Sequence, residues 1–466
     1  MSRIVIIGGG PGGYEAALVA AQLDADVTLV EADGAGGACV LSDCVPSKTF
    51  IASSEVVTGY RQNDQFGVHS AGLAAVTVDA VAVNERVKKL ALAQSGDIQA
   101  KLIKAGVDVV PGRARMGEDT LGHTHQVLIT PADGGEYALD AATVLIATGA
   151  TRRVLPTAVP DGDRILDWRQ IYDLTELPEH LIVIGSGVTG AEFASAYLAM
   201  GLDVTLVSSR ERVMPHEDAD AAMAIERVFR ERGMTILNQS RAASVENTGD
   251  GVLVTLTDGR TVTGSHALMA VGAVPNTADL GLREYGVEVA DGGYVAVDRV
   301  SRTNVPGVYA AGDCTGVLPL ASVAAMQGRI AIWHAMGEAV APLRLRTVSA
   351  NVFTDPELAT VGVSQDDVDA GTVPARQIML PLAGNARAKM AGLRDGFVKL
   401  FCRPATGQLV GGVVVAPKAS ELILPITMAV ENNLTVDQLA HTITIYPSLS
   451  GSIAEAARQL MQHGLQ

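Results

Sequence analysis

The 466-residue chain is short of basic side chains, of aromatic residues and of cysteine. Its 35 lysines and arginines are outnumbered by 51 aspartates and glutamates, and the net charge of -16 argues against nucleic acid or an anionic membrane surface as partner. No run approaches the ~20 apolar residues of a membrane-spanning helix, and the first residues lack the pattern of a signal peptide. We therefore expect a cytoplasmic protein that acts on a small molecule.

Four cysteines are too few for the disulfide framework of a secreted protein. Cys314 and Cys402 stand alone and are expected to be ordinary buried residues. Cys39 and Cys44 form a close pair, with four residues between them just before a predicted helix. Their spacing allows a local disulfide and differs from the C-x2-C of zinc sites, so we expect redox chemistry and no metal, although two unrelated buried cysteines stay possible. Because a helix N-terminus lowers a thiol pKa, a reduced Cys44 is expected to persist as thiolate.

Glycine, in contrast, is plentiful, with 49 residues in a chain that is 48% hydrophobic. Many tight turns and close backbone approaches follow from this, as in an α/β protein. At about 100–200 residues per domain, the length predicts two to four domains.

The stretch "RIVIIGGGPGGYEAALVAAQLDADVTLVEAD" predicts a dinucleotide-binding fold, because a strand, a glycine motif, a helix and a second strand follow in order. Gly8 permits the tight turn, Gly10 lets the backbone approach a pyrophosphate, and Gly13 lets the helix pack against the strand. Glu31 ends the second strand, where its carboxylate would accept hydrogen bonds from ribose hydroxyls.

The same plan recurs at a constant offset of 177 residues in "LIVIGSGVTGAEFASAYLAMGLDVTLVSSRER", which predicts a second dinucleotide site. The repeated residues are Gly185, Gly187, Gly190 and Glu192, the last of which corresponds to Glu15. Where the first motif has Glu31, the second has Ser208, followed by Ser209, Arg210 and Arg212. Without the ribose carboxylate, and with arginines that could meet a 2′-phosphate, this site should accept NADPH and need not exclude NADH. The arginines could also belong to a solvated surface loop.

Two further segments place polar residues after apolar strands. In "VLIATGA" these residues are Thr148 and Gly149, and in "TNVPGVYAAGDCTG" they are Gly312 and Asp313. A carboxylate at a strand end near a nucleotide would suit a polyol or ribose, although Asp313 could equally be an ordinary turn acid.

Taken in order, these motifs resemble the flavoprotein disulfide reductases, the class I pyridine nucleotide-disulfide oxidoreductases that include lipoamide dehydrogenase and glutathione reductase. The resemblance covers essentially the whole chain, through C-x4-C-x-P-S-K, ATG, "VGAVPN", AAGD and "VFTDPELATVG". It implies two Rossmann-like domains, for FAD and for NAD(P), and a C-terminal α+β dimerisation domain that forms a homodimer. The implied domains are FAD-binding at 1–150 and 275–340, NAD(P)-binding at 151–274, and dimerisation at 341–466.

The resemblance also implies roles for single residues. Cys44 would touch the flavin, Cys39 would exchange with substrate as the other half of a redox-active disulfide, and Lys48 with Glu192 would form an ion pair beside the flavin N5. The implied cofactor-binding residues are Gly8, Gly10, Gly13, Glu31, Gly37, Lys48, Ala114, Thr148, Gly149, Gly185, Gly187, Gly190, Glu192, Ser208, Ser209, Arg210, Gly272, Gly312, Asp313 and Ala321. Ala273 stands where the family usually has an arginine, which leaves the nicotinamide-nucleotide contacts there open.

The C-terminal segment departs from the family's acid–base motif H-x-H-P-T-x-x-E. Tyr446 stands at the place of the second histidine and Gly451 at that of the glutamate. A tyrosine, with an ordinary pKa of about 10, cannot replace an imidazole near pH 7, and losing a positioned general acid–base costs roughly 10²–10⁴-fold in rate. His441 matches no catalytic position and is expected to be an exposed or capping residue. We therefore expect poor turnover of disulfides.

Electron transfer to a quinone would need no such base, because reduced flavin can pass electrons to an acceptor docked on its ring. Tyr446, Pro447 and Leu449 would give the pocket a flat, apolar wall that suits a quinone. The passage "YPSLSGSIAEAAR" resembles a lipoamide-dehydrogenase-like branch of NAD(P)H:quinone reductases. The expected function is therefore an FAD-dependent NAD(P)H dehydrogenase (quinone) with Tyr446 in its acceptor site.

Two alternatives stay open. One is a dihydrolipoamide dehydrogenase or another disulfide reductase that uses the Cys39 and Cys44 pair. The other is a flavin-bearing docking subunit of a multi-protein complex, although no lipoyl domain, extra repeat or charged tail indicates a partner. The sequence leaves open the physiological acceptor, the preference between NADPH and NADH, and whether the disulfide cycles in turnover.

Overall fold

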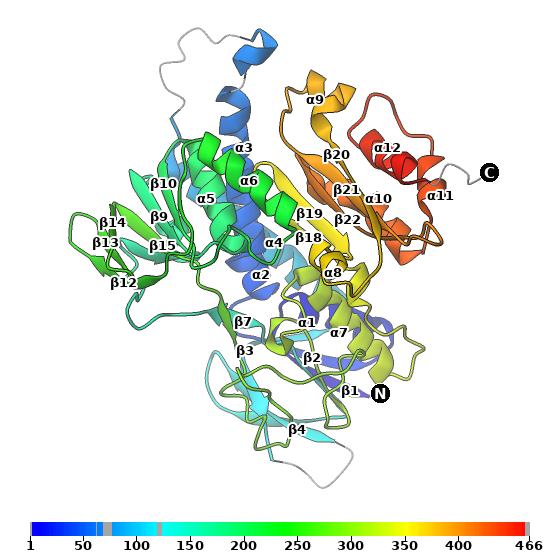
Figure 1. The fold of residues 1–466 in the computed structure, drawn as a ribbon. Helices are drawn as coiled ribbons and strands as arrows, with labels where there is room; N and C mark the ends of the chain where they lie inside the picture. The colour runs from blue at the N-terminus through cyan, green and yellow to red at the C-terminus, as the bar shows by residue number, and fades with distance from the viewer. Residues whose placement is uncertain (1, 62, 69–76, 119–123, 462–466) are drawn as a thin grey trace. The chain divides into compact units, whose positions relative to one another are not determined.

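The computed structural model describes residues 2–61, 63–68, 77–118 and 124–461 (Figure 1). The chain divides into two units. Unit 1 consists of Met1–Thr49, Val81–Arg153 and Gly272–Arg344, and unit 2 of Phe50–Ala80, Val154–Val271 and Leu345–Gln466. The partition made from the sequence, three domains in four segments, stays a prediction.

Unit 1 is built on a seven-stranded sheet in the order β17-β6-β1-β2-β3-β4-β5. The strands span, in that order, Val308–Ala310, Thr143–Ile146, Arg3–Ile7, Asp26–Glu31, Asp108–Met116, His125–Pro131 and Tyr137–Ala141. The first five strands are parallel, and β1 and β6 are almost wholly buried apolar runs, as expected where both faces of a sheet are covered. The last three strands form an antiparallel meander.

The helices of unit 1 include α1 (Pro11–Gln22) and α7 (Ala321–Ala335), which lie side by side (Figure 1). Their backbones approach so closely that a Cβ on Gly328 would lie 2.0 Å from the carbonyl oxygen of Gly12. Only glycine fits there. The remaining elements are α2 (Gly37–Leu41), α4 (Ala80–Lys104, of which only Ala80 belongs to unit 2), the short helix η3 (Asp313–Thr315), and the two-stranded ribbon of β7 (Ala150–Arg152) and β16 (Ala273–Pro275).

Unit 2 contains a second parallel sheet, in the order β11-β10-β9-β15-β8. These strands span Thr235–Leu237, Asp203–Val207, His180–Ile184, His266–Met269 and Ile165–Asp167, in that order. Helix α5 (Val188–Met200) follows β9, and helix α6 (Ala219–Glu231) comes between β10 and β11. A three-stranded antiparallel sheet is formed by β12 (Ala242–Asn247), β13 (Val252–Leu256) and β14 (Thr261–Gly264).

The C-terminal half of unit 2 is a five-stranded antiparallel sheet in the order β18-β19-β22-β21-β20. Its strands span Ser349–Val352, Glu357–Gly362, Leu409–Ala416, Phe397–Cys402 and Arg376–Pro381, in that order. Helix α10 (Ala419–Glu431) packs on β19 and β22, and α12 (Gly451–Leu460) packs on β20 and β21, so one apolar core lies between helices and sheet. The other helical elements here are α8 (Gln365–Asp369), α9 (Ala386–Met390), α11 (Val436–Ala440), η4 (Leu345–Thr347) and η5 (Leu382–Gly384).

A buried ion pair connects α6 to the C-terminal sheet. Lys399 lies on β21 with a side chain that is 1% exposed, and its Nζ donates to Asp218 at 2.9 Å and to Asp220 at 2.7 Å. Asp218 is as buried as the lysine and also caps α6, because its carboxylate accepts the N–H of Ala221. The two halves of unit 2 are therefore joined by charge as well as by packing.

Helix α3 (Cys44–Arg61) begins in unit 1 and continues in unit 2, which also holds η1 (Asn63–Phe66) and η2 (Gln170–Asp173). The predicted α/β class, with parallel-sheet nucleotide folds and a C-terminal dimerisation domain, is confirmed.

Among the residues that the structure describes, no helix is both long enough and apolar enough to span a membrane.

Candidate active site

The first glycine motif forms the turn between β1 and α1. Gly8 has a φ of +105°, and a Cβ there would lie 2.3 Å from the carbonyl oxygen of Ala147. A Cβ on Gly13 would lie 1.8 Å from the carbonyl oxygen of Gly8, so these two positions require glycine for close packing. Gly10 differs, because a Cβ on it would meet no atom within 4 Å. Its missing side chain leaves open space at the start of α1, where no side chain caps the first N–H groups.

Glu31 lies at the end of β2, beside this turn. Its carboxylate accepts the N–H of Gly9 through one oxygen and the N–H of Asp33, at 2.8 Å, through the other. The two bonds fix the orientation of the carboxylate at the edge of the glycine turn. This is the place where ribose binding was predicted, and that role stays a prediction.

The paired thiols of Cys39, in α2, and Cys44, the first residue of α3, are half-buried and hydrogen-bond to each other. The hydrogen bond from Cys44 lowers the pKa of Cys39, with a smaller lowering from Lys48, although burial and nearby acids oppose it. The same hydrogen bond, together with burial, raises the pKa of Cys44. These directions differ from the expectation of a Cys44 thiolate: the hydrogen bond between the two thiols favours the negative charge on Cys39.

Asp313 and Gly312 follow β17. Burial, and then the neighbouring charge of Asp43, raises the pKa of Asp313. Gly312 has a φ of +82° and donates its N–H to Oε1 of the buried Gln327 at 2.8 Å. The carboxyl group is thus held near the end of a parallel strand, in the half-buried surroundings that a polar ligand could share.

Thr148 and Gly149 follow β6 and are tied to the segment that includes Ala273. The backbone N–H of Asn276 donates to the carbonyl oxygen of Gly149 at 3.0 Å, and its side chain donates to that of Thr148 at 2.9 Å. Gly272 also contributes here, because its carbonyl oxygen accepts the N–H of Arg153 at 2.9 Å. These bonds hold the ATG turn and the start of the β7–β16 ribbon together.

The other residues predicted for unit 1 are dispersed along its elements. Gly37 begins α2 with a φ of +56°, and a Cβ on it would lie 3.0 Å from Cα of Gly10. Ala114 is buried in β3, Ala321 is the first residue of α7, and Lys48 donates to the hydroxyl of Ser47 at 3.3 Å. Gly37 is thus brought to the glycine turn. The uncapped start of α1, the open space at Gly10 and the carboxylate of Glu31 fit the pyrophosphate and ribose of a dinucleotide.

The second glycine motif, in unit 2, repeats the first in detail. Gly185 has a φ of +110°, and a Cβ on it would lie 2.2 Å from the carbonyl oxygen of Ala270. A Cβ on Gly190 would lie 1.9 Å from the carbonyl oxygen of Gly185, whereas one on Gly187 would meet no atom within 4 Å. Helix α5 also begins without a side-chain cap. The three glycines therefore have the same three structural roles in both nucleotide folds.

The two folds differ at the end of the second strand. Ser208 is fully buried and its hydroxyl lies 2.7 Å from that of Ser186, the residue that corresponds to Gly9. The exposed Arg210 donates its backbone N–H to Ser208, and Ser209 beside it is exposed as well. A pair of hydroxyl groups therefore takes the place of the carboxylate of Glu31, and the guanidinium of Arg210 is accessible to a ligand.

Glu192 lies one turn into α5 and is only 3% exposed. Its Oε1 accepts the backbone N–H of Phe353 at 3.0 Å, and the hydroxyl of Ser195 accepts the N–H of Asp355 at 3.1 Å. Sequence reasoning missed these partners, because a backbone N–H leaves no signature in residue type. Lys48 belongs to unit 1 and Glu192 to unit 2, so their predicted ion pair stays a prediction.

The segment before α12 exposes large apolar side chains. Tyr446 is 85% exposed, and Ile443 and Ile445 are exposed by 99% and 80%. Gly451 is the first residue of α12. His441 is the C-cap of α11 and is exposed, with its Nδ1 2.7 Å from the carbonyl oxygen of Asp437, which confirms the expected capping role.

Comparison with known proteins identifies the class. The family described as pyridine nucleotide-disulphide oxidoreductase matches residues 2–328, and its dimerisation domain matches residues 348–457. The chain belongs to the pyridine nucleotide-disulphide oxidoreductases, flavoproteins that bind FAD and NAD(P)H, so the predicted family and cofactors are confirmed.

The chain is also similar to individual proteins of this family. The chain is 59% identical to an NAD(P)H dehydrogenase (quinone) of Mycobacterium tuberculosis, over 99% of this chain and 94% of the relative. It is 34% identical to a dihydrolipoyl dehydrogenase of Chlorobaculum tepidum, over 98% and 97% of the two chains. The crystal structure of LpdA from Mycobacterium tuberculosis superposes with a TM-score of 0.95 at 59% identity, over 99% of this chain and all of that one.

Proposed function

We propose that this chain is an FAD-dependent NAD(P)H:quinone oxidoreductase that works as a cytoplasmic homodimer. The observation that carries the proposal is its 59% identity, along nearly the whole of both chains, to an NAD(P)H dehydrogenase (quinone). When bound, FAD takes a hydride from the nicotinamide and passes electrons to an acceptor that docks on its ring. We assign FAD to unit 1 and the nicotinamide nucleotide to the second glycine motif.

The positions of single residues at helix N-termini and strand ends support their proposed roles in nucleotide binding. The N-termini of α1 and α5 would each hold a pyrophosphate, and Glu31 would accept the ribose hydroxyls of FAD. Ser208 offers no carboxylate to repel a 2′-phosphate, and Arg210 offers it a cation. Because a hydroxyl group replaces the carboxylate at this position, the second motif should bind NADPH as well as NADH.

The acceptor site would be completed by the exposed segment around Tyr446, supplied by one subunit to the other. A tyrosine side chain can line a pocket for an aromatic ring and donate a hydrogen bond, but it offers no proton exchange comparable to that of histidine near neutral pH. The exposure of Ile443, Ile445 and Tyr446 supports this assignment, because such a patch needs a covering surface.

Steady-state turnover of the FAD-loaded protein with NADPH tests the proposal, with menadione and lipoamide as competing acceptors. We expect menadione to be reduced with the higher kcat/KM. Faster turnover of lipoamide would contradict the assignment and favour a disulfide reductase.

The disulfide reductase is the second candidate, and one observation favours it. Cys39 and Cys44 lie in hydrogen-bonding contact, and the pKa of Cys39 is lowered, as a nucleophilic thiol requires. A Cys44→Ser variant separates the two candidates, because quinone turnover should persist in it under our proposal and lipoamide turnover should be abolished.

A further inference from the structure

The turn that leads from β18 into β19 carries two backbone N–H groups toward helix α5. We propose that this turn, Phe353–Asp355, and the hydroxyl of Ser195 are positioning groups for the nicotinamide nucleotide, because they fix α5 and Glu192 on it. The inference rests on the proposed function only in taking the second glycine motif as the nicotinamide site. Neither the turn nor Ser195 was among the predicted site residues.

The first link is the hydrogen bond from Phe353 to Glu192. The carboxylate lies in the part of α5 just after the glycine turn, is 3% exposed, and accepts the N–H at 3.0 Å. A buried carboxylate needs such partners, because it has lost its water. Its orientation is therefore set by the backbone of the dimerisation domain.

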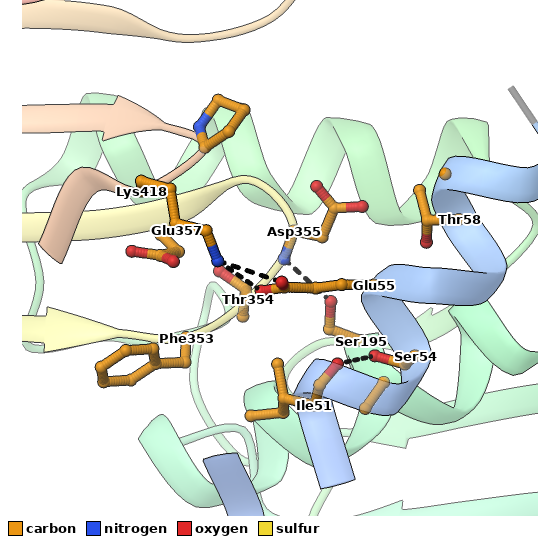
Figure 2. A pocket seen from close by; sticks show the side chains of 13 residues that line it. Ile51, Ser54, Glu55, Thr58, Ser195, Phe353, Thr354, Asp355, Glu357 and Lys418 are labelled. Carbon is orange, nitrogen blue, oxygen red and sulfur yellow. Dashed lines mark hydrogen bonds and ion pairs between the residues drawn. The ribbon is translucent and has the colours of Figure 1, made fainter. Parts of the chain in front are cut away.

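The second link lies one helical turn further along the same face of α5. Ser195 is 4% exposed and accepts the N–H of Asp355 at 3.1 Å (Figure 2). Residues three apart on a helix are neighbours on its surface, so Glu192 and Ser195 meet two alternate N–H groups of one extended turn. Two such bonds fix both the rotation of α5 and its position along its axis, which one bond could not do.

The turn is itself held in place. The hydroxyl of Thr354 donates to the carbonyl oxygen of Pro356 at 2.7 Å. Arg232 donates to both the carboxylate and the carbonyl oxygen of Asp355, at 2.8 and 3.0 Å. Just beyond, the buried carboxylate of Glu357 accepts the N–H of Ser420 at the start of α10. A turn anchored at three places can serve as a rigid reference for the helix it contacts.

Comparison of the two nucleotide folds shows that this anchorage belongs to the second fold alone. At the offset of 177 residues, Glu192 corresponds to Glu15 and Ser195 to Leu18. Glu15 pairs with Arg329 of α7 at 2.7 Å, and leucine has no hydrogen-bonding group in its side chain. The polar residue at 195 is thus a departure from the duplicated plan, at the position where α5 meets the turn.

Ser195 also lines a cavity of about 220 Å³, together with Ser54 of α3 (Figure 2). Ser54 is equally buried, at 4%, but its hydroxyl donates to the carbonyl oxygen of Ile51 within its own helix. Ser54→Ala is therefore a matched control for Ser195→Ala: the same hydroxyl is lost, at the same burial and in the same cavity, but the hydrogen bond that it made lies within α3.

The test measures the reduction of the flavin by NADPH in the FAD-loaded full-length protein. Stopped-flow spectroscopy records this reduction in the absence of any acceptor. We expect Ser195→Ala to raise the apparent Kd for NADPH roughly three- to tenfold, the effect of one lost hydrogen bond, and to increase the isotope effect with 4-deuterated NADPH. FAD content, melting temperature and reoxidation by menadione should match those of Ser54→Ala. Ser195→Thr, which keeps the acceptor and can place its methyl group in the cavity, should restore the wild-type Kd.

An unchanged Kd in Ser195→Ala, or equal changes in Ser195→Ala and Ser54→Ala, would overturn the inference. If Ser195→Ala does not fold, Arg232→Ala, which removes the two hydrogen bonds that hold Asp355, should raise the Kd for NADPH, and an unchanged Kd in that variant would overturn the inference. Because flavin reduction is measured without acceptor, failure of quinone turnover in the wild type would refute the proposed function and leave this result standing.

Discussion

At the scale of single residues, the thiol pair shows how one hydrogen bond can reverse an expectation based on helix position. Cys44 begins α3, where the helix N-terminus should favour its thiolate. Instead it donates its proton toward Cys39 and keeps it, so the pKa of Cys39 is the one that is lowered. The sulfur that is easier to ionise is thus the one that the resemblance assigns to exchange with substrate.

We predict that iodoacetamide modifies Cys39 before Cys44 in the reduced protein. The hydrogen bond from Cys44 stabilises the thiolate of Cys39, so Cys44→Ala, which removes the donor, should raise the pKa of Cys39 and move its alkylation profile to higher pH. Peptide mass spectrometry after timed alkylation measures both. The lone buried Cys402 offers a control, and Cys402→Ala should leave the profile unchanged. Faster alkylation of Cys44 would contradict the prediction.

The double variant Tyr446→His with Gly451→Glu should raise lipoamide turnover by roughly 10- to 100-fold, because it restores a histidine and the acid that orients it. The first atom of the new side chain is accommodated at position 451, since a Cβ on Gly451 would lie 3.4 Å from the hydroxyl of Ser448 and 3.6 Å from that of Thr444, which is ordinary contact. Tyr446→His with Gly451→Gln is the control for the charge. No gain in the double variant would refute the argument that a missing base limits disulfide turnover.

At the scale of elements, the two strand–glycine turn–helix units differ in residues that could decide nucleotide specificity. Ser186 and Ser208 occupy the places of Gly9 and Glu31, and their hydroxyl groups contact each other as the glycine N–H and the carboxylate do. We predict that Ser186→Gly with Ser208→Glu shifts the ratio of kcat/KM values from NADPH toward NADH by roughly 10- to 100-fold. The added carboxylate would bind the ribose hydroxyls and repel a 2′-phosphate.

Steady-state kinetics with both nucleotides measure this shift. Ser208→Glu alone should bind both nucleotides poorly, because Ser186 would obstruct the larger side chain. A double variant that keeps the wild-type preference would show that Ser208 does not face the adenosine ribose.

The strands, helices and glycine turns of both nucleotide folds could be predicted, because period, turn chemistry and the repeated spacing all indicate the same structure. The anchorage of Glu192 could not, since Phe353 and Asp355 act through backbone N–H groups. The lowered pKa of Cys39 could not be predicted either. The effect of a helix N-terminus on a thiol considers one sulfur, whereas here two thiols are in contact.

At the scale of the whole molecule, unit 2 is held together by Lys399 and its two aspartates. A lysine in the fully buried strand "FVKLFC" needs an opposite charge, and Asp218 supplies one with equally little exposure. Replacing the lysine by methionine would leave that buried carboxylate without an opposite charge, with the N–H of Ala221 still donating to it. We predict a loss of about 3–5 kcal/mol in the free energy of unfolding of Lys399→Met, measured by urea denaturation.

The ion pair of Arg227 with Asp395 is the matched control at the surface. Its two charged groups lie 2.7 Å apart, and the side chain of Arg227 is 57% exposed. Arg227→Met should cost at most about 1 kcal/mol. Equal losses in the two variants would show that burial does not decide the strength of these links.

The turn at Phe353–Asp355 also limits how the protein could have been assembled from parts. The first family match ends at residue 328, before either N–H donor. A relative that consists of those nucleotide folds alone would keep both glycine turns and yet have to hold the counterpart of Glu192 by other means. Under our proposal, the dimerisation domain therefore contributes to nucleotide binding within its own chain, through backbone N–H groups that contact α5, in addition to forming the dimer.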